Sequence, residues 1–166
     1  MISTIYIPDH YPGDGVEDTF AFSWRILAKT DLVVLTKVIA TGVVATLVLD
    51  TDFTVDDADV DTDDGGVIVL VDPATDLPTG TSIYILRHTA RTQLINLEEG
   101  LGFTPALVMK ALDRLTMIAQ EQDEILERCL KFAKVSAYDN IDVPDPQADK
   151  VLGWNATADD LDNLTN

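Results

Sequence analysis

Short apolar runs rich in Val, Ile, Thr and aromatic residues recur in residues 1–104, a pattern typical of β strands, and one of them, residues 19–24, alternates with period two. In residues 19–24 the alternation places Phe20, Phe22 and Trp24 on one face. A series of short strands separated by turns favours two packed sheets or a closed sheet, so we predict an antiparallel β-sandwich or barrel-like domain. The predicted strands are Ile2–Ile7, Thr19–Trp24, Leu32–Ala40, Val43–Leu49, Phe53–Val55, Val67–Val71 and Ser82–Arg87.

Glycine- and proline-containing turns separate these runs. Thr41-Gly42 lies between two apolar runs, which predicts a tight hairpin at that point. Asp64-Gly65-Gly66 predicts a second turn, and Pro78-Thr79-Gly80 a third.

Residues 105–134 have the periodicity of one long helix. Thr104 can cap its start, and Pro105 suits the first helical position because its missing N–H has no partner there. No Gly or Pro follows until Pro144. Residues spaced alternately three and four apart form a seam, and a second apolar row lies beside it. The seam is Val108, Ala111, Leu115, Ile118, Gln122, Ile125, Cys129 and Phe132, and the second row is Leu112, Ala119, Leu126 and Ala133.

Both rows would be exposed on an isolated helix, so the helix must pack against something. It could fold back on the β domain, giving an α+β arrangement, or its second half could meet copies of itself. Gln122 bears on this choice, since a polar residue at a core position of a coiled coil fixes register and oligomer state. The periodicity alone is compatible with both arrangements.

Residues 135–166 contain two prolines, many aspartates and little periodicity, which predicts an extended acidic tail. Within it, Val151-Leu152-Gly153-Trp154 is a small apolar segment. Leu152 and Trp154 are therefore candidate docking residues for a partner, although burial against the chain's own fold is equally compatible.

The charge is strongly acidic, with 29 Asp and Glu against 11 Lys and Arg and a formal net charge of −18. Residues 1–104 carry 17 acids and 5 bases, residues 105–134 carry 5 of each, and residues 135–166 carry 7 acids and 1 base. Such a surface repels phosphate backbones and anionic lipid, so neither nucleic acid nor a membrane is an expected partner. The first residues lack the features of a signal peptide, which predicts synthesis in the cytoplasm without secretion.

The residues that could carry chemistry form no active-site pattern. Cys129 is the single cysteine, and His10 and His88 stand in unrelated contexts. The loop 56–66 is rich in aspartate, but an EF-hand starting at Asp59 would need glycine at its sixth position and an acid at its twelfth, which this loop lacks. We therefore predict a non-enzymatic protein with no catalytic residue, cofactor or metal site, and leave loose calcium binding open.

Four segments stand out by their order along the chain: "YPGDGVEDTFAFSW", "DTDFTV" with the following "GGVIVLVDPATDLPTGTSIYILRHTARTQLINL", "GFTPALVMKALDRLTMIAQEQDEILER", and "KVLGWNA". Together they resemble the N-terminal tail-attachment domain of podovirus tail fibres and tailspikes. The resemblance covers about residues 6–158. The family usually has Glu near position 109, where this chain has Met109, so no role is carried over to that residue.

The resemblance implies a virion protein of the phage tail that assembles as a homotrimer. Residues 1–104 would dock on tail adaptor or nozzle proteins, residues 105–134 would form a trimeric bundle or coiled coil, and residues 135–166 would present a docking segment. Long members of the family continue beyond the equivalent of Trp154, so this chain is expected to act as an adaptor for a distal tail fibre or tailspike that contacts the host. The alternative is a stand-alone receptor- or glycan-binding module. The expected trimer interface is Leu115, Ile118, Gln122, Ile125 and Cys129, and the expected docking residues are Leu152 and Trp154.

Overall fold

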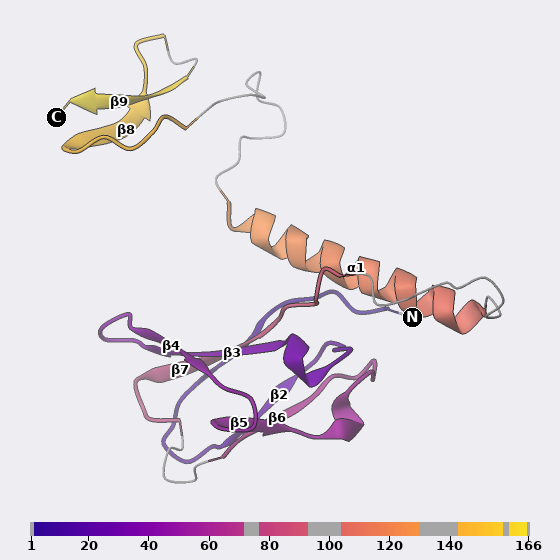
Figure 1. Ribbon diagram of the computed structural model, residues 1–166. Helices are drawn as coiled ribbons and strands as arrows, with labels where there is room; N and C mark the ends of the chain where they lie inside the picture. The colour runs from indigo at the N-terminus through magenta and orange to yellow at the C-terminus, as the bar shows by residue number, and fades with distance from the viewer. Residues whose placement is uncertain (1, 72–76, 93–103, 130–142, 158–159, 166) are drawn as a thin grey trace. The chain divides into compact units, whose positions relative to one another are not determined.

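The computed structural model describes residues 2–71, 77–92, 104–129, 143–157 and 160–165. The chain divides into two compact units, residues 1–128 and residues 129–166. Within the described residues, the first unit contains two antiparallel sheets and one α-helix, and the second contains a two-stranded antiparallel sheet. The protein is therefore of the α+β class, as its sequence predicts (Figure 1).

The first unit contains a four-stranded and a three-stranded sheet, here called the β head, in which neighbouring strands run antiparallel. The four-stranded sheet has the order β1 (Asp9–Pro12), β7 (Thr81–Arg87), β3 (Leu32–Val38) and β4 (Val44–Leu47). The three-stranded sheet has the order β2 (Thr19–Phe22), β6 (Gly66–Leu70) and β5 (Phe53–Val55).

The two sheets share one hydrophobic core, and they form two layers in Figure 1. The period-two alternation of β2 buries Phe20 and Phe22, and Trp24 continues the same side just beyond the strand. From the other sheet, Ile83 and Ile85 of β7 are fully buried against them. Each such side chain contributes about 1.5–3 kcal/mol relative to an exposed position.

In the β head the predicted strands match the observed ones to within two residues at each end, except at the start of the chain. Residues 2–7 form no strand, and β1 lies instead at Asp9–Pro12, where it pairs with β7. The β-forming residues that suggested a strand here have another arrangement: Tyr6 points into the core, whereas Ile5 and Ile7 are 81% and 68% exposed. This segment thus places one aromatic side chain in the core without pairing with a strand.

All three predicted turns have a glycine at positive φ, at Gly42, Gly65 and Gly80. Thr41-Gly42 connects β3 to β4 with Gly42 at φ +72°, which confirms the predicted hairpin. Gly65 precedes β6 at φ +77°, and a Cβ at that position would lie 2.0 Å from the carbonyl oxygen of Phe22. Gly65 therefore permits a close approach between two backbone segments that a side chain would prevent.

Helix α1 (Pro105–Glu127) begins as predicted, with the Thr104 side chain accepting a hydrogen bond from Leu107 N–H and Pro105 in the first turn. It ends earlier than predicted, because the Arg128 N–H turns back to the carbonyls of Ile125 and Leu126. Cys129 therefore lies beyond the helix, which corrects its predicted place on the helical seam. The rest of the predicted helix, from residue 130 on, lies outside the described residues. The described helix is not long and apolar enough to cross a membrane.

The second unit contains a β-hairpin of β8 (Lys150–Trp154) and β9 (Leu161–Thr165). This finding corrects the extended tail predicted for these residues. Aspartates and prolines dominate the composition of the region, but the apolar side chains of the two strands are paired across the ladder, as in Val151 opposite Leu164 and Trp154 opposite Leu161.

Candidate interaction surfaces

One face of α1 is buried against the β head and carries charged residues. Asp113, Met117 and Glu121 are 6%, 0% and 4% exposed, and their spacing of four places them on one side of the helix. Buried carboxylates require partners, since an unpaired buried charge is strongly unfavourable. Two arginines of the head provide them.

The first pair joins Arg87 at the end of β7 to Glu121. Arg87 follows Ile83 and Ile85 on the inward side of the strand, so its side chain enters the end of the core. Its Nε lies 2.8 Å from Oε1 of Glu121. The same carboxylate accepts hydrogen bonds from Thr89, at 3.1 Å from the backbone N–H and 2.6 Å from Oγ1. Glu121 is thus held by the strand and by the segment that follows it.

Both terminal nitrogens of Arg87 also have hydrogen-bond partners. Its Nη2 donates to the Met117 carbonyl at 3.3 Å and to the Gln120 side chain at 3.1 Å, and its Nη1 donates to the Arg25 carbonyl at 3.1 Å. The guanidinium carbon lies 4.5 Å from the ring centroid of Tyr6, within cation–π range. Burial raises the pKa of Tyr6 to about 12, although the hydrogen bond from Arg87 N–H opposes the rise.

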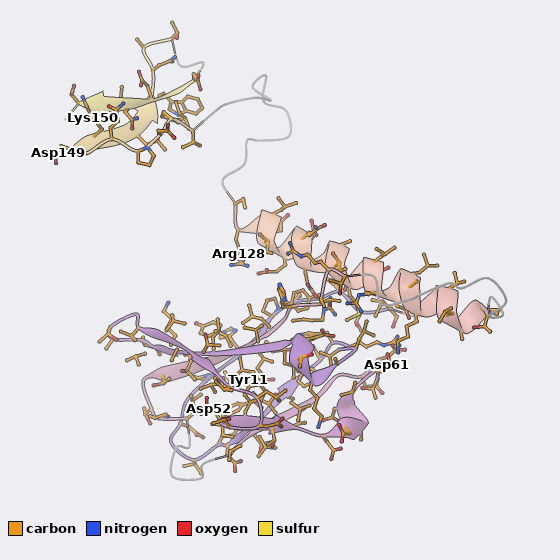
Figure 2. The ribbon with its side chains drawn as sticks, viewed as in Figure 1. Tyr11, Asp52, Asp61, Arg128, Asp149 and Lys150 are labelled. Atoms are coloured by element: carbon orange, nitrogen blue, oxygen red, sulfur yellow. The ribbon has the colours of Figure 1, made fainter. Side chains whose placement is uncertain are left out.

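The second pair joins Arg25 to Asp113 near the other end of the helix. Arg25 Nη1 lies 3.0 Å from Asp113 Oδ2, and the guanidinium also contacts Asp61 at 2.6 Å and Asp63 at 3.2 Å. Ile2 N–H donates to Asp113 Oδ1 at 3.1 Å. Burial by itself raises the pKa of Asp113, but the Ile2 hydrogen bond and nearby positive charge, Arg25 included, hold it below its ordinary value. Figure 2 labels Asp61 on the loop beside α1.

The acidic loop 56–66 is bound largely by the protein's own groups. Asp57 pairs with Lys29 at 2.9 Å, and Asp59 Oδ2 accepts a hydrogen bond from Val67 N–H at 3.0 Å. Within the described ranges, no three His, Cys, Asp or Glu residues form a group that could hold a metal ion. Asp61 and Asp63 form ion pairs with Arg25, which also binds Asp113 of α1. The loop therefore supports the contact between head and helix.

The opposite face of α1 is apolar and exposed. At 100° per residue, its centre lies across the helix axis from Met117. Leu115 is 63% exposed, Leu126 60% and Leu112 52%. We call this set of residues, spaced three and four apart, the exposed stripe: Leu112, Leu115, Ala119, Gln122 and Leu126.

The residues of the predicted interface are distributed around this stripe. Leu115 and Gln122 lie on it, and Ile125 is 44% exposed beside it. Ile118 is partly buried at its edge, and Cys129 is exposed beyond the helix end. The exposed face is therefore rotated from the predicted seam toward the second apolar row, because the head covers part of one side of the helix.

A second apolar surface lies on the β3–β4 hairpin. Residues 38–49 contain no charged side chain, although the whole chain has a net charge of −18. Strand β4 is the last strand of its sheet, so one of its edges has no neighbouring strand in the described fold. Charges or prolines usually protect such an edge, and β4 contains neither. The exposed residues of this surface are Val38, Ile39, Val43, Val44 and Val48.

The C-terminal hairpin carries the predicted docking residues. Leu152 and Trp154 are each 46% exposed. They alternate with Gly153 along β8 and therefore lie on the same side of the hairpin. The structure thus keeps both side chains accessible within their own unit.

Sequence reasoning did not identify the two ion pairs that hold the helix to the head. A signal was present at Arg87, because a charged residue that follows Ile83 and Ile85 on an inward-facing pattern needs a buried partner. The sequence also indicated the partner of Arg87, because Glu121 lies four residues from Met117 on a face of the helix that lacks the exposed leucines.

Comparison with known proteins gives one relationship of note. Over 130 residues the chain is 35% identical to the tail spike protein of Salmonella phage epsilon15. The match covers 78% of this chain and 12% of that protein. No family model matches the chain. The chain is therefore similar to one part of a phage tail spike protein and spans only about an eighth of that protein's length.

Proposed function

We propose that the protein is a non-enzymatic part of a phage tail, which assembles as a trimer and connects the tail to a distal component that contacts the host. The observation that carries this proposal is the exposed stripe on the face of α1 opposite the head. The similarity to a tail spike protein supports the location in a virion tail.

The stripe has the spacing of a coiled-coil seam. Three exposed leucines would leave apolar surface in water on a single chain, and contact with other copies would remove it at about 25 cal/mol per Å². Gln122 stands among them, where a polar residue restricts register and oligomer state. Ile118 and Ile125 widen the surface beyond the narrow seam of a two-stranded coil, which favours three chains.

The β head attaches to the tail in this arrangement. The uncharged surface at residues 38–49 is suited to this contact, because apolar exposed patches and unprotected edge strands are common binding surfaces. The acidic remainder of the head favours a partner with basic residues around its apolar contact. Tail adaptor or nozzle proteins are the proposed partners.

Light scattering on the purified protein tests the trimer. The expected mass is about three times the 18.1 kDa of the chain. Replacing Leu115 and Leu126 together with Asp should give a monomer that retains its β and helical signal, because both side chains are exposed in the single chain.

A matched control adds the same charge to the same helix away from the stripe. Met109 and Thr116 are exposed on another side of α1, so the double variant Met109→Asp and Thr116→Asp should keep the trimer mass. A monomeric unmodified protein, or a control that dissociates as readily as the stripe variant, would contradict the proposal.

A further inference from the structure

The ladder of the C-terminal hairpin defines two faces with different chemistry. Directly opposed residues of an antiparallel pair lie on the same side, and successive residues alternate between sides. One side, here called the hairpin face, is therefore formed by Lys150, Leu152, Trp154, Leu161, Asn163 and Thr165.

The hairpin face is apolar at its centre and contains no carboxylate. Leu152 and Trp154 are each 46% exposed, and Trp154 is paired with Leu161 across the ladder. This is unusual for its region, since residues 135–166 hold 7 acids and 1 base, the base being Lys150 on this face. Asp162 lies on the other side, opposite Gly153.

The other side of the hairpin is partly filled by its own side chains. A Cβ at Gly153 would lie 2.7 Å from Cδ1 of Leu164, so the leucine side chain occupies the space above the glycine. Only Val151 and Leu164 are apolar there, at 48% and 39% exposure. Because a two-stranded hairpin is at best marginally stable in water, the hairpin face is the surface whose burial would stabilise this unit.

We infer that three copies of the hairpin pack their hairpin faces together around the threefold axis, forming a second trimer contact after the helix. This inference rests on the trimer of the proposed function. Residues 128–149 tether each hairpin to α1, so a helical bundle would hold three hairpins at high local concentration.

Charge favours sister hairpins as the occupants. Three copies of an acidic chain repel one another wherever carboxylates are brought close, and none of the six ladder residues of the hairpin face carries one, although Asn163 Nδ2 donates to the Asp145 carbonyl at 2.8 Å. The large ring of Trp154 beside Leu152 gives each copy an aromatic anchor for the contact. A distal tail protein bound at the same two residues is the other occupant that the experiment must separate.

Acrylamide quenching of tryptophan fluorescence in the full chain tests the inference. The chain has two tryptophans: Trp24 is 1% exposed in the head core, whereas Trp154 lies on the hairpin face. Quenching should therefore report mainly on Trp154, which the variant Trp154→Phe confirms by removing the quenchable signal. The unmodified trimer should be quenched weakly, and the monomeric Leu115→Asp, Leu126→Asp variant should show a several-fold higher quenching constant.

A second variant separates the hairpin contact from the helical one. Leu152→Asp should raise quenching of Trp154 while light scattering still gives the trimer mass, since the exposed stripe is intact. A trimer in which Trp154 is as accessible as in the monomeric variant would overturn the inference and leave the helical trimer standing. Equal protection of Trp154 in trimer and monomer would overturn it too, because the cover would then come from the same chain. A monomeric unmodified protein would instead remove the proposed function itself.

Discussion

The Glu121 carboxylate of α1 lies 2.8 Å from Nε of Arg87 at the end of β7, and both side chains are nearly inaccessible to solvent. This ion pair connects the helix to the core of the β head. Because Thr89 donates two further hydrogen bonds to the same carboxylate, loss of Glu121 would leave several buried donors without an acceptor.

The first prediction concerns this pair. Glu121→Ala should lower the free energy of unfolding by about 3–5 kcal/mol, since it leaves the Arg87 charge buried and unpaired. Denaturant unfolding followed by circular dichroism measures the change. Glu124→Ala is the matched control on the same helix, because Glu124 pairs with Arg128, which is 63% exposed; it should cost only about 0.3–0.5 kcal/mol. Equal losses in the two variants would show that burial of the Arg87 pair adds nothing.

The second prediction concerns acid. The lowered pKa of Asp113 means that the unfolded chain binds a proton at this residue more readily than the folded chain. Its stabilising contribution is therefore complete above the ordinary Asp value of about 3.9 and is lost as the pH falls through the lowered pKa of the folded state. Asp113→Asn should cost about 1–3 kcal/mol at pH 7 and progressively less below about pH 4.

Thermal unfolding of the two proteins across this range measures the difference. It is best followed at low protein concentration, since the isoelectric point is near 4.1. A difference that stays constant down to strongly acidic pH would contradict the assigned role of Asp113.

The third prediction separates backbone strain from steric contact at two glycines. Gly65 and Gly80 both have positive φ, but a Cβ at Gly80 would meet nothing within 4 Å, whereas one at Gly65 would collide with the Phe22 carbonyl. Gly80→Ala should cost about 1–2 kcal/mol, the strain of the left-handed conformation alone. Gly65→Ala should cost clearly more, because β2 or the turn must move. Similar denaturation midpoints for the two variants would contradict the tight approach at Gly65.

The fourth prediction concerns salt. Each chain carries a net charge of −18, so copies repel one another at low ionic strength. Raising the salt from about 0.01 M to about 0.15 M shortens the screening length from about 30 Å to about 8 Å, which should lower the dissociation constant of the trimer. Sedimentation equilibrium at both salt concentrations measures it, and the Leu115→Asp, Leu126→Asp variant should remain monomeric at both. A trimer that weakens with added salt would indicate that ion pairs, and not the apolar stripe, hold the copies together.

The secondary structure of the head could be predicted because its strands are short, rich in β-forming residues and separated by turn residues. The alternation of Phe20 and Phe22 and the Thr41-Gly42 hairpin are local features, and both are found in the structure. The start of the chain was mispredicted for a physical reason: Tyr6 is an isolated anchor, and periodicity cannot distinguish one buried residue between two exposed ones from a strand.

For helix α1, the sequence pattern predicted the start but neither the end nor the surface that the helix packs against. Its start was marked by Thr104 and Pro105, whereas its end at Glu127 has neither glycine nor proline and depends on backbone contacts of Arg128. The choice between packing on the head and packing on other copies could not be made from the apolar residues alone. The head binds the polar face through Asp113 and Glu121, so the apolar face is the one that stays exposed.

The ion pairs of Asp113 and Glu121 also determine which face of α1 a single chain exposes to solvent. Asp113 and Glu121 are eight residues apart, or about 12 Å along the helix axis, and each is fixed to a different arginine of the head. A helix that is bound at two points on one side cannot rotate about its axis. The leucines of the exposed stripe therefore already face the solvent in a single chain. If the chains form the proposed trimer, their encounter needs no conformational rearrangement, and association should proceed as rigid-body docking, with rate constants of about 10⁵–10⁷ M⁻¹s⁻¹.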